Sequence, residues 1–253
     1  FEEVKGNDRY TEDLSYFQAD MNFKLGNFEK AIEQGLEQLP KANRQEIPQL
    51  NKIIGESYFN LGNYQEAIPY LKGYNGLQGK WNNTDYYQLG YAYYKQGNYE
   101  AAISEFNKIV DGKNAIAQNA YYHLAQSYLE SDQKQQALNA FKNASEMEFD
   151  AKIKEDALFN YAKLSYEIGN SYESPSQVLI NYLNAYPASD HKSEMESLLI
   201  DSFITSKNYE EAMRLLENNR NFSDKQAYQK VAYFYGLEIF EAAEYYEAIK
   251  NFD

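Results

Sequence analysis

The sequence predicts an all-α protein built as a solenoid of about seven antiparallel helical hairpins. Three observations lead to this fold class. A short phrase recurs at a nearly constant spacing, its residues are those of a tight turn between helices, and apolar residues follow a helical period on both sides of it. A fixed period in this range is typical of a solenoid, which grows by adding units rather than by enlarging one core.

The recurring phrase ends on an alanine that follows an aromatic or polar residue by three positions. The copies are Gly26–Ala31, Gly62–Ala67, Gly97–Ala102, Asp132–Ala137, Lys207–Ala212 and Ala243–Ala248. Successive alanines are separated by 36, 35, 35, 75 and 36 residues. The gap of 75 residues has room for two units, so we expect a hidden copy between Ala137 and Ala212.

The phrase has the chemistry of a turn. Glycine ends a helix by adopting the left-handed conformation without strain. The asparagine that follows in Gly26-Asn27, Gly62-Asn63 and Gly97-Asn98 is expected to cap the next helix through its side chain. Apolar residues recur at helical spacing on both sides of the third copy, at Tyr86, Leu89 and Tyr93 before it and at Ala102, Phe106 and Ile109 after it.

These residues resemble the tetratricopeptide repeat, whose pattern is a large residue, then Leu-Gly, Tyr, Ala and Phe at fixed spacings. The third unit matches through Tyr86, Leu89-Gly90, Tyr93, Ala102 and Phe106. The resemblance implies a right-handed α-solenoid that occupies residues 1–253 as a single domain. The expected repeats are residues 11–46, 47–81, 82–116, 117–153, 154–190, 191–227 and an incomplete 228–253.

Two departures from the repeat pattern lie in the second half of the chain. The fifth unit carries a longer turn through Ser171–Ser176 and ends in Tyr186-Pro187-Ala188-Ser189, an ending similar to that of repeats in bacterial envelope proteins. The seventh unit stops at Asp253 without a polar capping element, which solenoids usually have. We therefore expect a bacterial protein and a fragment of a longer chain.

Charge and composition disfavour several classes of partner. The net charge is −14, which repels nucleic acid and anionic membrane surfaces. No apolar stretch approaches the roughly 20 residues that span a bilayer, so no membrane insertion is expected in this fragment. The chain has no cysteine, which excludes disulfides and thiol chemistry.

No catalytic, metal or cofactor site is expected, and the protein is predicted not to be an enzyme. His123 is interpreted as a half-buried packing residue and His191 as a loop residue, because neither has a second histidine at ligand spacing. The stretch Gly73–Trp81 lacks the spacing and the Ser or Thr of a phosphate loop, so it is interpreted as an inter-repeat loop. The many carboxylates are interpreted as solvated helix faces.

The partner surface is predicted from the leading helices, which line the concave face in the tetratricopeptide family. The expected contact residues there are Tyr87, Tyr91, Tyr94, Tyr122, Gln126, Phe159, Lys163 and Tyr166. One hypothesis is an aromatic groove for a peptide or a partner helix. The alternative is that some of these rings only pack against the adjacent hairpin.

A clamp for a terminal carboxylate, used by chaperone-tail-binding members of the family, is not expected. Lys52 and Asn60 occupy two matching positions, but Asp20 stands where an asparagine is needed and would repel a carboxylate.

Three functions remain open at the level of sequence. The first is a protein-interaction scaffold with an unidentified protein or peptide partner. The second is an assembly component of a bacterial envelope complex, and the third is a regulatory arm of a larger protein. The acidic composition, the missing cysteines and the Tyr186–Ser189 ending favour export to the periplasm of a Gram-negative bacterium over a cytoplasmic location.

Overall fold

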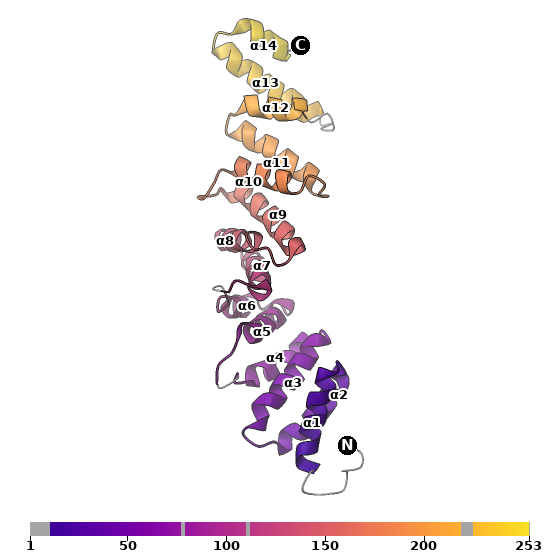
Figure 1. Cartoon of the computed structure of the whole chain (residues 1–253). Coiled ribbons are helices and arrows are strands. Elements are labelled where there is room, and N and C mark those ends of the chain that lie inside the picture. The colour runs from indigo at the N-terminus through magenta and orange to yellow at the C-terminus, as the bar shows by residue number, and fades with distance from the viewer. Residues whose placement is uncertain (1–10, 77–78, 110–111, 219–224, 253) are drawn as a thin grey trace. The chain divides into compact units, whose positions relative to one another are not determined.

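The chain is almost entirely helical (Figure 1). The computed structural model describes residues 11–76, 79–109, 112–218 and 225–252, which form fourteen α-helices, one 3-10 turn at Leu39–Lys41 and no β-strand. The helices are α1 (Thr11–Lys24), α2 (Phe28–Gln38), α3 (Glu46–Asn60), α4 (Tyr64–Gly73), α5 (Asn83–Lys95), α6 (Tyr99–Phe106), α7 (Ala115–Glu130), α8 (Lys134–Ser145), α9 (Ala151–Ile168), α10 (Pro175–Ala185), α11 (Lys192–Thr205), α12 (Tyr209–Asn218), α13 (Lys225–Glu241) and α14 (Tyr245–Phe252).

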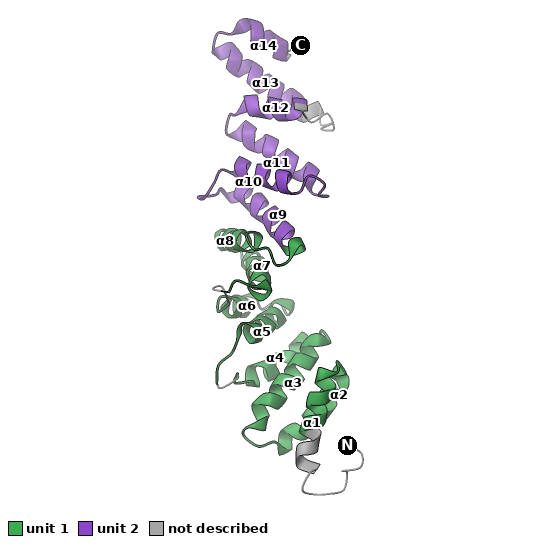
Figure 2. Ribbon diagram, in the orientation of Figure 1, with its two compact units in different colours: residues 1–153 green, residues 154–253 purple. Residues whose placement is uncertain are grey.

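Neighbouring helices pack in chain order within two compact units, residues 1–153 and 154–253 (Figure 2). In the first unit, each of the helices α1 to α8 contacts the next one along the chain. In the second unit, the same holds from α10 to α14. The predicted all-α array of helical hairpins is therefore confirmed. The prediction of one solenoid across residues 153 and 154, with seven repeats at the stated bounds, stays a prediction.

The turns between paired helices share one hydrogen-bond pattern. After α1, the Gly26 N–H donates to the Phe23 carbonyl at 3.0 Å and the Asn27 N–H donates to the Asn22 carbonyl at 2.8 Å. This pair of bonds is the Schellman motif, which satisfies carbonyls at a helix C-terminus. The residue at the Gly26 position has a positive φ in every copy: 77° at Gly26, 78° at Gly62, 72° at Gly97, 56° at Asp132, 57° at Lys207 and 65° at Ala243. The predicted left-handed helix ends are thus confirmed.

The predicted asparagine caps are confirmed at only one of three turns. Asn98 accepts a bond from the Ala101 N–H at 3.3 Å, whereas Asn27 and Asn63 make no side-chain cap bond. The backbone does not distinguish the three turns, since ψ is 66° at Asn27 and Asn63 and 74° at Asn98. The Asn27 side chain instead donates to Oδ1 of Asn22 at 3.2 Å. At all three turns the backbone N–H of the asparagine donates to a carbonyl of the preceding helix.

Small residues let the paired helices approach closely. The phrase alanines Ala31, Ala67, Ala102 and Ala137 are completely buried. A Cβ atom added to Gly55 would lie 2.8 Å from the backbone nitrogen of Leu71 on α4, so only glycine fits that α3–α4 contact. The repeat phrase therefore encodes close helix packing as well as the turn.

The lengthened turn of the fifth unit ends two residues earlier than predicted. α9 ends at Ile168 and α10 begins at Pro175, so Ser176 lies in the first turn of α10 and not in the connection. The Ser174 side chain caps α10 by accepting from the Gln177 N–H, a geometry that proline at the first helical position favours. At the other end of α10, the buried Tyr182 hydroxyl lies 2.8 Å from Ser189 Oγ, which gives the Tyr-Pro-x-Ser ending a structural role.

Candidate functional site

Three tyrosines lie along one face of α5. Tyr87, Tyr91 and Tyr94 are spaced by four and three residues, which places them on the same side of a helix. Their rings contact each other in series, with centroids 5.8 Å apart for Tyr87 and Tyr91 and 6.1 Å apart for Tyr91 and Tyr94. All three side chains are half-buried, so each has one packed side and one accessible side.

His123 of α7 joins these tyrosines to the next hairpin. Its ring centroid lies 4.9 Å from that of Tyr91, 5.2 Å from that of Tyr94 and 5.4 Å from that of Tyr122. Its Nδ1 lies 3.0 Å from Oε1 of Gln126, so the tautomer that carries its proton on Nδ1 donates a hydrogen bond to that amide oxygen. The interpretation of His123 as a half-buried packing residue is confirmed.

We call this group the His123 cluster, which consists of Tyr87, Tyr91, Tyr94, Tyr122, His123 and Gln126. It contains five of the eight contact residues predicted from sequence. Sequence reasoning did not place His123 in the candidate surface, although its position next to Tyr122 on α7 was a usable signal.

Aromatic residues from the preceding hairpin extend the cluster. Phe59 of α3 and Tyr64 of α4 contact Tyr91, with centroid distances of 5.8 and 5.6 Å. Tyr99 of α6 contacts Tyr94 at 6.1 Å. Tyr64 and Tyr99 are the aromatic residues of the recurring phrase. Their contacts hold the rings of Tyr91 and Tyr94 in the His123 cluster in place.

Burial favours the uncharged forms of His123, Tyr87 and Tyr94. Desolvation lowers the pKa of His123 to about 4, against a smaller opposing effect of the bond to Gln126. Burial also raises the pKa of the Tyr87 and Tyr94 phenols, with smaller contributions from neighbouring tyrosines. At neutral pH the cluster therefore offers neutral rings and hydroxyl groups rather than an ionic surface.

The remaining predicted contact residues lie on α9 in the second unit. Phe159 stacks on His191 with centroids 4.0 Å apart, and Lys163 pairs with Glu194 at 2.7 Å. The Lys163 Nζ also lies 5.1 Å from the Phe159 ring centroid. Tyr166 is half-buried. These residues therefore link α9 to the start of α11, and their membership in a partner surface stays a prediction.

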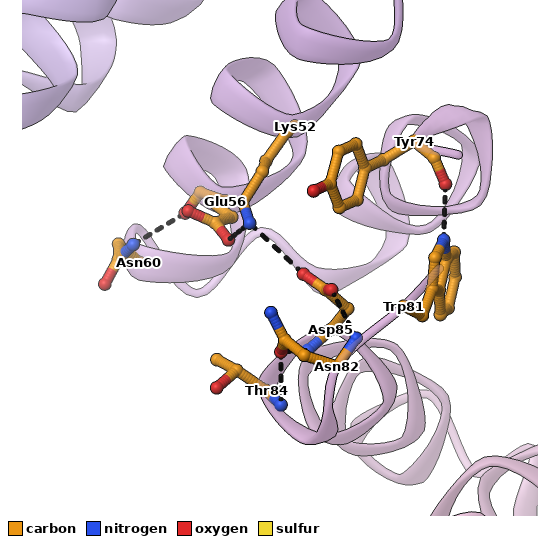
Figure 3. A network of polar contacts seen from close by, with 8 residues as sticks. All are labelled: Lys52, Glu56, Asn60, Tyr74, Trp81, Asn82, Thr84 and Asp85. Carbon is orange, nitrogen blue, oxygen red and sulfur yellow. Dashed lines mark hydrogen bonds and ion pairs between the residues drawn. The ribbon is translucent and has the colours of Figure 1, made fainter. Parts of the chain in front are cut away.

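The candidate carboxylate clamp is already occupied by charges of the chain itself (Figure 3). Lys52 Nζ lies 3.2 Å from Asp85 and 3.7 Å from Glu56, so its charge is compensated by two carboxylates. Asn60 donates to the backbone carbonyl of Glu56 at 2.7 Å. Asp20 pairs with the lysine one turn further along α1 at 2.6 Å. The network joins α3 to α5 and leaves no free cation there for a terminal carboxylate.

Two further classes of site are not found in the part of the chain that the structure describes. Its histidine and carboxylate residues form no group of three that could hold a metal ion. None of its helices is long and apolar enough to cross a membrane.

Comparison with known families adds two matches in the first unit. The family model for the tetratricopeptide repeat matches residues 53–77, and the model for anaphase-promoting complex, cyclosome, subunit 3 matches residues 77–144. The first match covers α3, α4 and the turn phrase Gly62–Ala67. The hairpin α3–α4 is thus similar to a tetratricopeptide repeat. No curated protein sequence matches the chain.

Solved structures of tetratricopeptide-repeat proteins share the fold. A repeat protein from Parabacteroides merdae is 17% identical with a TM-score of 0.50, over 95% of this chain and 90% of that one. The C-terminal part of a repeat-containing protein from Cytophaga hutchinsonii is 16% identical with a TM-score of 0.54, over 93% of each chain. MamA protein is 20% identical with a TM-score of 0.54, over 70% of this chain and 93% of that one. Identities this low support the fold and no particular partner.

Proposed function

We propose that this protein is a non-catalytic interaction scaffold whose His123 cluster binds a peptide or a segment of a partner protein. The observation that carries the proposal is the assembled set of half-buried rings on the leading helices α5 and α7. Tetratricopeptide repeats are helical arrays that present such surfaces, and tyrosine is enriched among residues that dominate binding energy.

The packing of the cluster favours binding because the rings are already ordered. Tyr91 contacts Phe59, Tyr64, Tyr87, Tyr94 and His123. A ring held on several sides loses little rotamer freedom when a partner covers its remaining face, and that lowers the entropic cost of association. The neutral character of the cluster selects a partner segment with apolar or aromatic side chains and backbone groups that can bond to tyrosine hydroxyls.

The test first captures a partner with the wild-type protein. The affinity of that partner for variants with single substitutions in the cluster is then compared with its affinity for the wild type. We expect Tyr91→Ala to weaken binding at least tenfold and Tyr91→Phe to retain most of it, because phenylalanine keeps the ring contacts. The matched control is Tyr246→Ala on α14, whose side chain is 87% exposed. Unchanged binding by Tyr87→Ala, Tyr91→Ala and Tyr94→Ala variants with wild-type helicity would remove the cluster as the contact surface.

The cellular location is part of the same proposal. We infer export to the periplasm of a Gram-negative bacterium, supported by the absence of cysteine and the net charge of −14. Fractionation of cells that express the full reading frame tests this, and recovery in the cytoplasmic fraction would contradict it.

A further inference from the structure

A cavity lies away from the His123 cluster, between α4, α5 and α6. It has a volume of about 670 Å³ and is lined by residues from the end of α4, the following loop and both helices of the next hairpin. Cavities of 300–1,000 Å³ hold ligands of the size of a nucleotide or a few amino-acid residues. No residue of the His123 cluster lines this cavity.

The charge of the cavity is opposite to that of the protein. Its lining contains Lys72, Lys80 and Lys108 and a single carboxylate, Glu105, in a chain whose net charge is −14. Lys108 pairs with Glu105 at 2.7 Å. Among the described residues, neither Lys72 nor Lys80 forms an ion pair, so two positive charges remain uncompensated. A cavity with this balance concentrates anions.

The wall of the cavity is aromatic and fixed. The Trp81 indole N–H donates to the Tyr74 backbone carbonyl at 2.6 Å, as Figure 3 shows. The Trp81 and Tyr86 ring centroids lie 5.2 Å apart with the planes inclined by 51°. Lys108 Nζ lies 5.1 Å from the Tyr86 centroid, so a cation borders the same wall. Held rings of this kind offer a stacking surface for a flat ligand.

We propose that this cavity binds an aromatic phosphate, that is, a molecule that contains both a phosphate monoester and a flat aromatic ring. A phosphate monoester bears close to two negative charges at neutral pH, which matches the two uncompensated ammonium groups of Lys72 and Lys80. The ring stacks on Trp81 and Tyr86. The site is no phosphate loop of the nucleotide-binding type, because the phosphate is held by side chains and not by a glycine-rich turn after a strand.

Two sources supply this chemistry, a free nucleoside monophosphate or a phosphotyrosine in a peptide. Trp81 is the only tryptophan of the chain, so its fluorescence reports on this cavity alone. Adenosine monophosphate, a phosphotyrosine peptide, inorganic phosphate and adenosine are titrated separately against the whole protein. We expect saturable quenching by at least one aromatic phosphate, with inorganic phosphate and adenosine at least tenfold weaker. The stronger of the two aromatic phosphates identifies the source.

Charge variants make the test specific. Lys72→Gln and Lys80→Gln are each expected to weaken the aromatic phosphate at least fivefold, and their combination more than twentyfold. Lys30→Gln on α2, an exposed lysine outside the cavity, is the matched control and is expected to bind like the wild type. The proposal is overturned if no aromatic phosphate changes Trp81 emission, if adenosine binds as tightly as its monophosphate, or if the lysine variants bind unchanged.

Discussion

His123 makes the stability of the first unit depend on pH. Its pKa is about 4 in the folded protein because burial disfavours the imidazolium, whereas an unfolded chain has the ordinary value of 6.5. The unfolded state therefore binds more protons between these two values, and stability is lost as pH falls from about 6.5 towards 4. A difference of 2.5 pKa units corresponds to about 3 kcal/mol, of which about 2 kcal/mol is lost by pH 5.

Replacement of His123 by phenylalanine isolates this contribution. His123→Phe keeps a ring between Tyr91 and Tyr122 but cannot be protonated. Urea unfolding followed by Trp81 fluorescence reports on the first unit, and we expect the wild type to lose about 2 kcal/mol more than the variant between pH 7 and pH 5. The raised pKa of Glu56 acts in the opposite direction in both proteins and cancels in the comparison. Equal pH dependence of the two proteins would refute the assigned burial of His123.

Three further changes test the packing and the turns. Lys207→Gly should stabilise the second unit by about 0.5–1 kcal/mol, because φ is 57° there and glycine adopts that conformation without strain. Gly55→Ala should destabilise the first unit by about 1–2 kcal/mol, because its Cβ would lie 2.8 Å from a backbone nitrogen of α4. Lys52→Met should cost about 2 kcal/mol, because it leaves the buried carboxylates of Glu56 and Asp85 without their cation.

Denaturant unfolding measures all three changes, and two of them have a control variant. Lys207→Ala should give no gain, since alanine keeps the strained φ; an equal gain would mean that the charge and not the turn is responsible. Adding Glu56→Gln to Lys52→Met should recover part of the loss, and a purely additive loss would contradict the network. Gly55→Ala with wild-type stability would show that α3 and α4 separate freely.

The hairpins and their left-handed turns followed from sequence because both depend on local residues. The phrase Gly97–Ala102 contains its own helix stop, and its spacing to the next copy defines the unit. The predicted caps at Asn27 and Asn63 were wrong because residue type alone does not determine which partner the side chain takes, and Asn27 donates to Asn22 on the preceding helix. Asparagine was correctly interpreted as a turn residue at all three positions, and as a side-chain acceptor only at Asn98.

The candidate sites were less accessible to sequence reasoning because they combine residues from several helices. Spacing placed Tyr87, Tyr91 and Tyr94 on one face, but it could not show that His123 sits among them. The sequence did not predict the cavity between α4 and α6. Lys72 and Lys108 are 36 residues apart in the sequence and line the same cavity only because consecutive hairpins pack together.

Site-specific photocrosslinking tests the central claim most directly. A photoreactive amino acid replaces Tyr94 or Gln126 in the His123 cluster, and Gln136 on α8 in a control protein, in cells of the native host. The proposed scaffold function predicts one and the same partner segment, captured at Tyr94 and Gln126 and absent at Gln136. Capture of identical partners from all three positions, or of none at the cluster while the protein remains folded, would contradict it.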